Sequence, residues 1–583
     1  MSHRNILPYV AALLLFFHTP LSAQESHTFV HTIQRGETVY SIARTYQVSP
    51  DAILQLNPSA QDGIKAGATL IIPQGTPQEK FHTIQPGETL YQLTKTYNVD
   101  ADAICKANPG LTADNFQSGK VIRIPASNRP AAATAAKPAV PVRPKCKETY
   151  KVKRKETIYS ISQKFGLSET ELRDANPEMK APDYQLRKGD LICIPYPATG
   201  QPKPVLTPVN PEAPSNAELL ARKSTPTPKR YIRMGVILPL KGNTPEHKKM
   251  IEFYRGVLMA VEDIKKTGVS VDVFTYDAGQ SAADMKAVLS RNALTELDFI
   301  IGPLRAEQIP ALSGFCQKSK TRLVVPFSSQ GDEMYQNPYY YAVNPPKSFL
   351  FSEAAHLTTE LFGKDNLILM DGKESDDDAV AFTEAVNRRL LQNGRKMGTL
   401  QLNDTELKWL ETMNQFQTNV IIPNSSSIKL LNQMFPKLKE FTKKYPQYRI
   451  KLIGYPEWQT YTSSQLENFY RFDTYAFSTF YRNPLNGHAD QFDTNYQKAF
   501  HETTIASWPC FGMLGFDTGY FFLKGLSTYG DALEQHLAEV KTTPYQHQFN
   551  FQRTSNWSGF INKDTEFIHY TTAHSIELIR LKK

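Results

Sequence analysis

One cysteine and one histidine are the only residues in the chain whose types and order suggest nucleophilic catalysis. Cys510 lies in the stretch SWPCFGMLGFD, and His501 precedes it. A helix beginning at Cys510 could lower the pKa of its thiol and favour the reactive thiolate, but the simpler interpretation is an ordinary helix start. The sequence lacks the motifs H-E-x-x-H, G-x-S-x-G and S-x-x-K with K-T-G. We therefore expect a protein that is not an enzyme.

Metal chemistry has one candidate segment, the acidic run from Glu374 to Asp378. Carboxylates at this density could hold Ca²⁺ weakly, but the simplest interpretation is a solvated loop that opens a helix. The five cysteines do not have the spacing of a zinc site. We therefore predict neither a metal site nor a cofactor.

Three similar stretches organise the N-terminal part of the chain. HTIQRGETVYSIARTYQV begins at His31, HTIQPGETLYQLTKTYNV at His82, and the looser YKVKRKETIYSISQKFGL at Tyr150. In each, an alternating run predicts a strand, and apolar residues at helical spacing predict the helix that follows. A second short helix ends at an Asn-Pro dipeptide, and a glycine followed by a strand closes the unit. The sequence thus predicts three small βααβ modules: module 1 (residues 28–73), module 2 (79–125) and module 3 (147–195).

These motifs resemble the LysM domain, a small carbohydrate-binding module. LysM domains bind polymers that contain N-acetylglucosamine, chiefly peptidoglycan or chitin, in a shallow groove between the Gly-Glu-Thr turn and the Asn-Pro loop. Several weak grooves on one chain raise avidity; the alternative is that the modules are structural spacers. The resemblance implies that these residues bind glycan: Gly36, Glu37, Thr38, Asn57, Pro58 and Ile64 in module 1, and Gly87, Glu88, Thr89, Asn108 and Pro109 in module 2. In module 3, Lys155 replaces the turn glycine, so we expect this groove to bind most weakly.

From residue 231 the pattern changes to apolar strands that alternate with amphipathic helices. The strand-like segments are IRMGVILPL, VSVDVFTYDA, LDFIIGPL and RLVVPFSS, followed by a second series, NLILMDG, TNVIIPN, RIKLIGYP and TYAFSTFYR. This alternation predicts an α/β domain with two doubly wound lobes and a cleft between them. The segments GVILPL, GVLMAVEDI, FIIGPLRAEQIPAL, VVPFSS and GFDTGYFFLKG resemble the type I periplasmic-binding-protein fold of the leucine-binding-protein branch, over residues 231–583.

The same resemblance implies a ligand cleft in this C-terminal domain. In members that bind amino acids, polar residues after the Gly-Pro turn and after the next strand hold the ligand. Arg305, Ser328 and Ser329 occupy these places. Arg305 departs from the family pattern, because it replaces a small hydroxyl donor. It could bind a carboxylate in bidentate fashion, or it could be a surface arginine on a domain that no longer binds small molecules.

The first 23 residues, with the apolar run VAALLLFF and a small-residue end at Ser22-Ala23, are typical of a secretory signal peptide. Residues 126–146 and 196–230 are rich in Pro, Ala and Thr and predict semi-rigid linkers. No later stretch is long and apolar enough to cross a membrane. The net charge of +9 over 583 residues is too diffuse to indicate nucleic-acid binding.

An exported chain permits disulfides. Because the first and last strands of a LysM domain pair antiparallel, the resemblance implies a disulfide between Cys146 and Cys193 in module 3. Cys105, Cys316 and Cys510 are most simply buried thiols. The whole sequence therefore predicts an exported, periplasmic or envelope-associated protein that binds peptidoglycan. Its C-terminal domain serves either as a sensor or scaffold for a wall-synthesis or division protein, or as a tethered binding protein for an amino acid or muropeptide.

Overall fold

The computed structural model describes residues 28–74, 79–126, 146–153, parts of 157–195, 214–220, 225–290, 292–372, 374–483 and 487–580. The predicted signal peptide (1–23), most of both predicted linkers and Lys155 lie outside the described residues. Most of modules 1 and 2 forms one compact unit with the C-terminal domain, whereas module 3 belongs to a second unit and is described by itself. Among the described helices, none has the length and apolar character needed to span a membrane.

Module 1 has the predicted βααβ order. Its elements are β1 (Thr28–Thr32), α1 (Val39–Tyr46), α2 (Pro50–Leu56), a 3₁₀ turn (Pro58–Asp62) and β2 (Thr69–Pro73). The strands pair antiparallel, with Phe29 opposite Ile72. Thr38 precedes α1 and forms a capping box with Ser41. The Thr38 hydroxyl accepts the Ser41 N–H, and the Ser41 hydroxyl accepts the Thr38 N–H. Ser49 caps α2 in the same position before the helix.

Modules 2 and 3 repeat parts of this order. Module 2 contains β3 (Glu79–Thr83), α3 (Leu90–Thr96), α4 (Ala101–Ala107) and β4 (Val121–Pro125), and its two strands are antiparallel. The described elements of module 3 are β5 (Cys146–Lys151), α5 (Ile158–Phe165) and β6 (Leu191–Pro195), and β5 and β6 are also antiparallel. A short helix, α7 (Asn216–Leu220), precedes the C-terminal domain.

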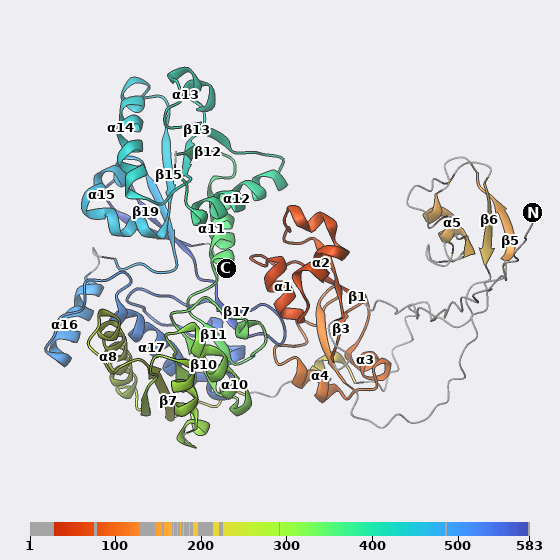
Figure 1. Ribbon diagram of the computed structural model, residues 1–583, viewed down its shortest axis with the longest axis horizontal. Helices are drawn as coiled ribbons and strands as arrows, with labels where there is room; N and C mark the ends of the chain where they lie inside the picture. The colour runs from red at the N-terminus through yellow and green to blue at the C-terminus, as the bar shows by residue number, and fades with distance from the viewer. Residues whose placement is uncertain are drawn as a thin grey trace, which may run out of the picture. The chain divides into compact units, whose positions relative to one another are not determined.

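The first lobe of the C-terminal domain, lobe 1, is a seven-stranded sheet in the order β17-β18-β11-β10-β9-β7-β8. Figure 1 labels β7, β10, β11 and β17 of this lobe. Every neighbouring pair is parallel except β17 with β18. Apolar clusters cover both faces of this sheet, which explains why its strands are almost continuously apolar. The elements are β7 (Tyr231–Leu238), α8 (Pro245–Lys265), β8 (Ser270–Asp277), α9 (Ala282–Leu289), β9 (Phe299–Ile301), α10 (Ile309–Ser319), β10 (Arg322–Val325), β11 (Tyr340–Ala342), α16 (His488–Phe500), α17 (Phe511–Tyr529), β17 (Phe551–Arg553) and β18 (Phe560–Asn562).

Lobe 2 is a second seven-stranded sheet in the order β13-β12-β14-β15-β16-β19-β20, in which β19 and β20 are antiparallel additions to a parallel sheet. The chain enters lobe 2 after β11, returns to lobe 1 after β16, and crosses again after β18. The prediction of a two-lobed, doubly wound α/β domain is therefore confirmed. Its elements are α11 (Lys347–Phe362), β12 (Asn366–Asp371), α12 (Asp377–Gln392), β13 (Gly398–Gln401), α13 (Glu406–Thr412), β14 (Asn419–Pro423), α14 (Ile428–Lys444), β15 (Ile450–Gly454), α15 (Thr462–Arg471), β16 (Thr474–Ser478), β19 (Glu566–Tyr570) and β20 (Ile576–Ile579).

Glycines allow α8 and α17 of lobe 1 to pack backbone against backbone. A Cβ atom on Gly256 would lie 1.9 Å from the Gly512 carbonyl oxygen, and one on Gly515 would lie 2.0 Å from the Phe253 carbonyl oxygen. Real Cβ atoms do not approach so closely, so only glycine fits at this crossing. The packing accounts for glycine in the segments GVLMAVEDI and GFDTGYFFLKG, which carried the resemblance.

Candidate glycan-binding grooves and cleft

The Gly-Glu-Thr turn of module 1 is held by a buried carboxylate. Gly36 has φ +83°, a left-handed conformation that favours glycine. The Glu37 carboxylate accepts the Gln34 N–H at 2.6 Å and pairs with His31 Nε2 at 2.8 Å, and the Glu37 side chain is only 3% exposed. His31 Nδ1 in turn bonds the Tyr46 hydroxyl at 2.7 Å. Glu37 therefore shapes the turn from inside the module, and the turn backbone is what it offers to a ligand.

Module 2 repeats this arrangement. Gly87 has φ +77°, and the Glu88 carboxylate bonds His82 Nε2 at 2.6 Å and accepts the Gln85 N–H at 2.9 Å. Burial by itself would raise the pKa of Glu88, but the hydrogen bonds from His82 and Gln85 outweigh it and lower that pKa. Glu88 is therefore held ionised as part of the turn.

The asparagine of each Asn-Pro dipeptide joins the second helix to the closing strand. In module 1, Asn57 Nδ2 donates to the carbonyls of Ile53 and Ile71, both at 2.7 Å, and its Oδ1 accepts the Ile71 N–H at 2.9 Å. Asn108 and Asn176 make the same set of bonds in modules 2 and 3. The N–H groups and the carbonyl oxygen of each side-chain amide are thus bonded inside the module, and Asn57 and Asn108 are buried.

The remaining predicted groove residues lie nearer the surface. Thr38 is half-buried and uses its hydroxyl as the cap of α1; Pro58 is exposed, and Ile64 is half-buried against the module core. In module 2, Thr89 and Pro109 are half-buried. A ligand of module 1 would therefore meet backbone groups of the turn and the Ile64 side chain, and the glycan-binding role of all these residues stays a prediction.

A cavity of about 380 Å³ lies over the predicted groove of module 1. One wall is made by the turn from Gln34 to Val39 and the loop from Gly63 to Ala66. The facing wall is made by α11 and α12 of lobe 2. A Cβ atom on Gly36 would meet Phe349 at 2.5 Å, so the turn packs directly against the C-terminal domain. The groove therefore opens into a space shared with lobe 2.

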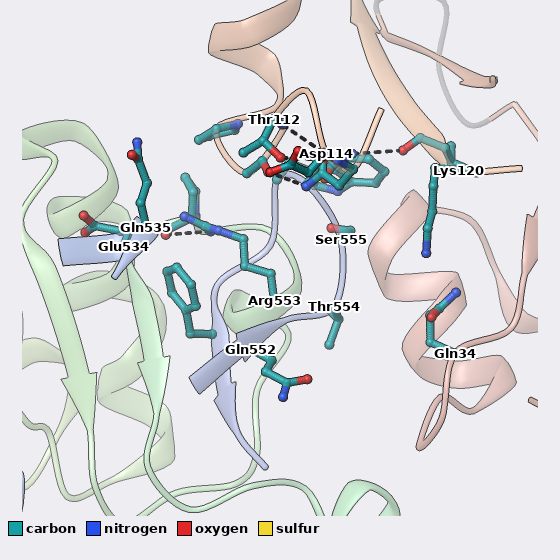
Figure 2. A pocket seen from close by; sticks show the side chains of 18 of the residues that line it. Gln34, Thr112, Asp114, Lys120, Glu534, Gln535, Gln552, Arg553, Thr554 and Ser555 are labelled. Carbon is teal, nitrogen blue, oxygen red and sulfur yellow. Dashed lines mark hydrogen bonds between the residues drawn. The ribbon is translucent and has the colours of Figure 1, made fainter. Parts of the chain in front are cut away.

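A second, larger cavity of about 990 Å³ is lined by residues of module 1, module 2 and lobe 1. Figure 2 shows Thr112, Asp114 and Lys120 of module 2 on one side and the segment from Gln552 to Ser555 on the other. The backbones meet at this boundary, because the Gly110 N–H donates to the Asn556 carbonyl at 2.6 Å. The loop after the module 2 Asn-Pro dipeptide, like the module 1 turn, is thus in contact with the C-terminal domain.

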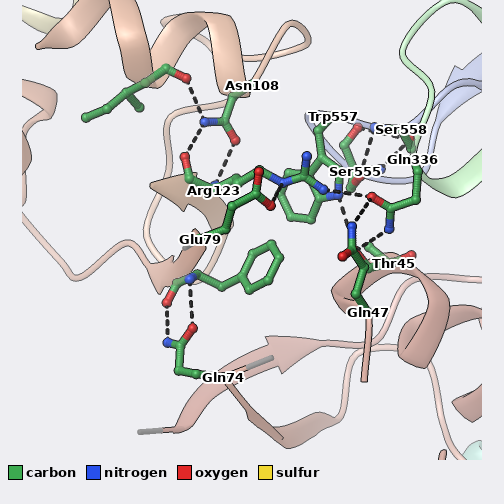
Figure 3. Close-up of polar contacts among 12 residues, drawn as sticks. Thr45, Gln47, Gln74, Glu79, Asn108, Arg123, Gln336, Ser555, Trp557 and Ser558 are labelled. Atoms are coloured by element: carbon green, nitrogen blue, oxygen red, sulfur yellow. Dashed lines mark hydrogen bonds and ion pairs between the residues drawn. The ribbon is translucent and has the colours of Figure 1, made fainter. Parts of the chain in front are cut away.

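A tryptophan of the C-terminal domain completes the core of module 1. Trp557 lies in the loop between β17 and β18, is 1% exposed, and packs against Tyr46 and Phe81 with ring centroids 5.8 and 5.3 Å away. Its Nε1 donates to the Thr45 carbonyl at 3.3 Å. Figure 3 shows Trp557 beside the Arg123 guanidinium, which lies 5.0 Å from the ring. Modules 1 and 2 are therefore anchored to lobe 1 by a shared apolar core.

Polar contacts surround this anchor (Figure 3). Gln336 Nε2 donates to the Thr45 carbonyl at 3.0 Å, and its Oε1 accepts from Arg123 at 2.8 Å. Arg44 of α1 pairs with Asp332 at 3.1 Å. Sequence reasoning missed Trp557 and Gln336 entirely; a tryptophan within the polar loop TSNWSG was the available signal.

The predicted cleft residues of the C-terminal domain have partners within lobe 1. Arg305 Nη2 donates to Glu246 at 2.7 Å and to Gln280 at 2.5 Å, and its side chain is 28% exposed. The Ser328 hydroxyl accepts the Gln330 N–H at 3.1 Å, and Ser329 is half-buried. None of Arg305, Ser328 and Ser329 lines either cavity described above, and their role in ligand binding stays a prediction.

The residues considered above for catalysis and metal binding are a buried thiol, an exposed histidine and the carboxylates at the start of a helix. Cys510 precedes α17 and is buried, and burial raises the pKa of its thiol to about 12, so the idea that the helix activates this thiol is wrong. His501 is exposed at the end of α16. In the acidic run, Asp376 caps α12 by accepting the Ala379 N–H at 2.7 Å, and Glu374 pairs with Lys429 at 2.6 Å. The run opens a helix, as expected.

The cysteines follow the expected pattern in part. Cys193 is disulfide-bonded, whereas Cys105, Cys316 and Cys510 are not in a disulfide. Cys316 and Cys510 are buried, but Cys105 is half-buried, contrary to the expectation. The side chain of Cys146 lies outside the described residues, and β5 and β6 bring its backbone opposite Pro195. The pairing of Cys146 with Cys193 remains a prediction.

The LysM domain model matches this chain at residues 31–73, 82–125 and 150–195. These are modules 1, 2 and 3, and the resemblance found in the sequence is thereby confirmed for them. Two curated relatives are a probable peptidoglycan endopeptidase, LytE of Bacillus subtilis (strain 168), 24% identical over 153 residues, and an endolysin of Bacillus phage B103, 29% identical over 103 residues. The matches cover 25% and 17% of this chain, and the chain spans only 44% and 39% of the length of these relatives.

Solved structures resemble the other part of the chain. An ABC transporter substrate-binding protein from Sphaerobacter thermophilus is 15% identical with a TM-score of 0.38, over 60% of this chain and 97% of that one. The branched-chain amino acid substrate-binding protein LivJ from Streptococcus pneumoniae, solved with isoleucine, is 14% identical with a TM-score of 0.33, over 60% and 99%. The chain therefore combines three regions that match the LysM domain model with a C-terminal α/β domain of two seven-stranded sheets.

Proposed function

We propose that this is an exported, non-enzymatic protein of the cell envelope that binds peptidoglycan through its LysM modules. The C-terminal domain acts as a sensor or scaffold in wall maintenance. The observation that carries this proposal is the position of the module 1 groove. Its two loops, Gln34 to Val39 and Gly63 to Ala66, face α11 and α12 of lobe 2 across a single cavity. A glycan in this groove would contact the C-terminal domain directly, so binding of the wall and the state of the domain are coupled.

The anchor at Trp557 supports the coupling. Module 1 shares its core with lobe 1 through Trp557, and it also pairs with lobe 2 through Arg35 and Glu353 at 3.3 Å. A ligand that changes how module 1 sits against either lobe would therefore favour one arrangement of the lobes over another.

Sedimentation with purified peptidoglycan tests the proposal. The whole chain should pellet with peptidoglycan, and soluble oligomers of N-acetylglucosamine should release it, because each groove recognises the sugar rather than the cross-link. The whole chain is needed, since a fragment ending at residue 195 would lose Trp557 from the core of module 1. A chain that stays in the supernatant at low salt would refute wall binding, and hydrolysis of the peptidoglycan would refute the non-enzymatic assignment.

The alternative, a solute-binding protein tethered to the wall, is supported less well. The Arg305 guanidinium already bonds Glu246 and Gln280, so a free carboxylate would have to displace an existing anion. No described contact links Arg305 to Ser328 or Ser329.

A further inference from the structure

The cavity over the module 1 groove is strongly basic. Four cationic side chains and one carboxylate are among its described lining residues: Arg35, Lys65, Arg388 and Arg389, with Glu37. The Glu37 carboxylate is already bonded to His31 and the Gln34 N–H within the module. Within the described part of the chain, no ion pair joins this carboxylate to a cation of the cavity.

The guanidinium of Arg389 has only neutral partners among the described residues. Its Nη2 donates to His356 Nδ1 at 2.7 Å, and its Nε donates to the Thr359 hydroxyl at 3.0 Å. Because an arginine cannot accept a hydrogen bond, His356 Nδ1 must carry no proton. Burial, followed by the charges of Arg35 and Arg389, lowers the pKa of His356, which agrees with a neutral ring.

Neighbouring cations crowd Arg389 further. Burial lowers the pKa of Arg389, and the positive charge of Arg35 lowers it further. The nearby Glu360 and Glu353 raise this pKa, but each does so by less than Arg35 lowers it. Arg388 lies on the same helix and is exposed to the cavity. Within the described part of the chain, neither Arg388 nor Arg389 has a carboxylate within ion-pair distance.

Arg35 connects this cluster to the sugar-binding loop. It belongs to the turn of module 1 and pairs with Glu353 at 3.3 Å, so one acidic group offsets one of the four cations. The remaining charges face a partly enclosed space. Arg388 and Lys65 are exposed and Arg389 is half-buried, and an anion that enters would gain charge-assisted hydrogen bonds from these side chains.

We propose that this cavity binds a glycan strand that carries carboxylates. The loops of module 1 contact the N-acetyl sugar, and Arg388 and Arg389 of α12 bind a carboxylate attached to the strand. This inference rests on the proposed function, and it names the part of the wall polymer that the shared cavity recognises. The ligand would bridge module 1 and lobe 2, which gives the C-terminal domain a direct contact with the wall.

Substitution of Arg388 tests the inference in the whole chain. Arg388→Gln removes one cavity charge from an exposed position, and the matched control Lys439→Gln removes a charge from the exposed face of α14 in the same lobe. Binding is measured by calorimetry against solubilised glycan strands with free peptide carboxylates, against the same strands after amidation of those carboxylates, and against neutral N-acetylglucosamine oligomers.

The unchanged protein should bind the carboxylate strands roughly fivefold to twentyfold more tightly than the amidated ones. Arg388→Gln should reduce the logarithm of this affinity ratio by at least half and leave binding of the neutral oligomers unchanged. Lys439→Gln should change neither the ratio nor the binding of the neutral oligomers. Equal affinity for carboxylate and amidated strands would overturn the inference while the proposed function stands. If the unchanged protein binds none of the three ligands, both the inference and the proposed function are overturned. In a fourth titration, a carboxylate-free phosphate polymer should bind more weakly than the carboxylate strands. Tighter binding of that polymer would overturn the assignment of the anion to a glycan carboxylate.

Discussion

At the scale of single residues, the asparagine of each Asn-Pro dipeptide has a structural role. Asn57, Asn108 and Asn176 each bond a helix carbonyl and both backbone groups of one residue in the closing strand. The amide completes backbone hydrogen bonds on the edge of the closing strand that faces away from its paired strand. A module with such a small core depends on these bonds.

Asn57→Ala is expected to lower the free energy of unfolding by about 1–3 kcal/mol, because it removes the hydrogen bonds to both backbone groups of Ile71 and one of the two that the Ile53 carbonyl accepts. Chemical denaturation of the whole chain, followed by circular dichroism, measures the change. Gln55→Ala, an exposed position on the same helix, is the control and should change the stability little. Equal effects of the two substitutions would contradict the assigned role.

A second residue-scale feature is the carboxylate of Asp473 in lobe 2. It pairs with Lys451 and with His569 Nε2, both at 2.7 Å. Burial alone would raise its pKa, but the hydrogen bonds from His569 and Lys451 outweigh this and lower the pKa to about 2.

Because the folded-state pKa lies below the ordinary aspartate value of about 3.9, Asp473 stabilises the fold fully above about pH 4. This contribution disappears as the pH falls toward about 2. Asp473→Asn should therefore cost up to about 2 kcal/mol at pH 6 and much less at pH 2.5. Urea unfolding at the two pH values measures the difference, with Glu440→Gln, an exposed substitution, as the control. A cost that does not change between the two pH values would show that the ion pairs are not responsible.

At the scale of elements, the hairpin of β17 and β18 joins two parts of the chain that the sequence separates widely. Its loop carries Trp557 into the core of module 1, and the Asn556 carbonyl bonds the Gly110 N–H of module 2. A large aromatic ring buried between two small cores removes apolar surface from water on both sides.

Trp557→Ala should destabilise the modules by about 3–5 kcal/mol and uncouple them from the C-terminal domain. Differential scanning calorimetry should then show a separate, earlier transition for modules 1 and 2. Trp508→Ala, at a tryptophan that is 39% exposed, should leave the transition of the modules in place. A single unshifted transition in Trp557→Ala would mean that the contact does not stabilise the unit.

The antiparallel strands β5 and β6 of module 3 carry the two cysteines of the predicted disulfide. Cys193 is disulfide-bonded, and of the remaining cysteines Cys146 is the one on the paired strand. Peptide mapping without reductant should recover Cys146 and Cys193 in one cross-linked fragment. Recovery of Cys193 joined to Cys105, Cys316 or Cys510, or alkylated as a free thiol, would refute the pairing.

At the scale of the whole molecule, module 1 contacts both lobes of the C-terminal domain. It meets lobe 1 at Asp332, Gln336 and Trp557 and lobe 2 at Glu353. Opening or closing of the two lobes would therefore change the cavity over its groove.

The C-terminal domain is accordingly expected not to bind free amino acids with micromolar or tighter affinity. Arg305 is bonded to Glu246 and Gln280, and it would repel the ammonium group of an amino acid while its carboxylate competed with Glu246. Calorimetry of the whole chain against the twenty amino acids measures this. One micromolar binder, whose affinity falls in Ser328→Ala, would restore the solute-binding alternative.

The sequence by itself determined the local units. The repeated turn, caps and helical spacing predicted the modules, and the alternation of apolar strands with helices predicted both lobes, because these signals depend on residues that are close together in the chain. Strands β11, β13, β17, β18, β19 and β20 were not predicted. They are short or join the sheets from distant segments, so their pairing is set by packing rather than by their own pattern.

Only the tertiary structure decided how the candidate site is built. Arg35 of module 1 and Arg389 of lobe 2 face one cavity, and Trp557 lies in a core with Tyr46 and Phe81, although no periodicity in the sequence relates these residues. The same holds for Glu37 and Asn57, whose polar side chains suggested ligand contacts and instead bond the module's own backbone. A polar residue in a loop has the same appearance in the sequence whether it faces a ligand or its own chain, and folding selects the partner that leaves no buried group unpaired.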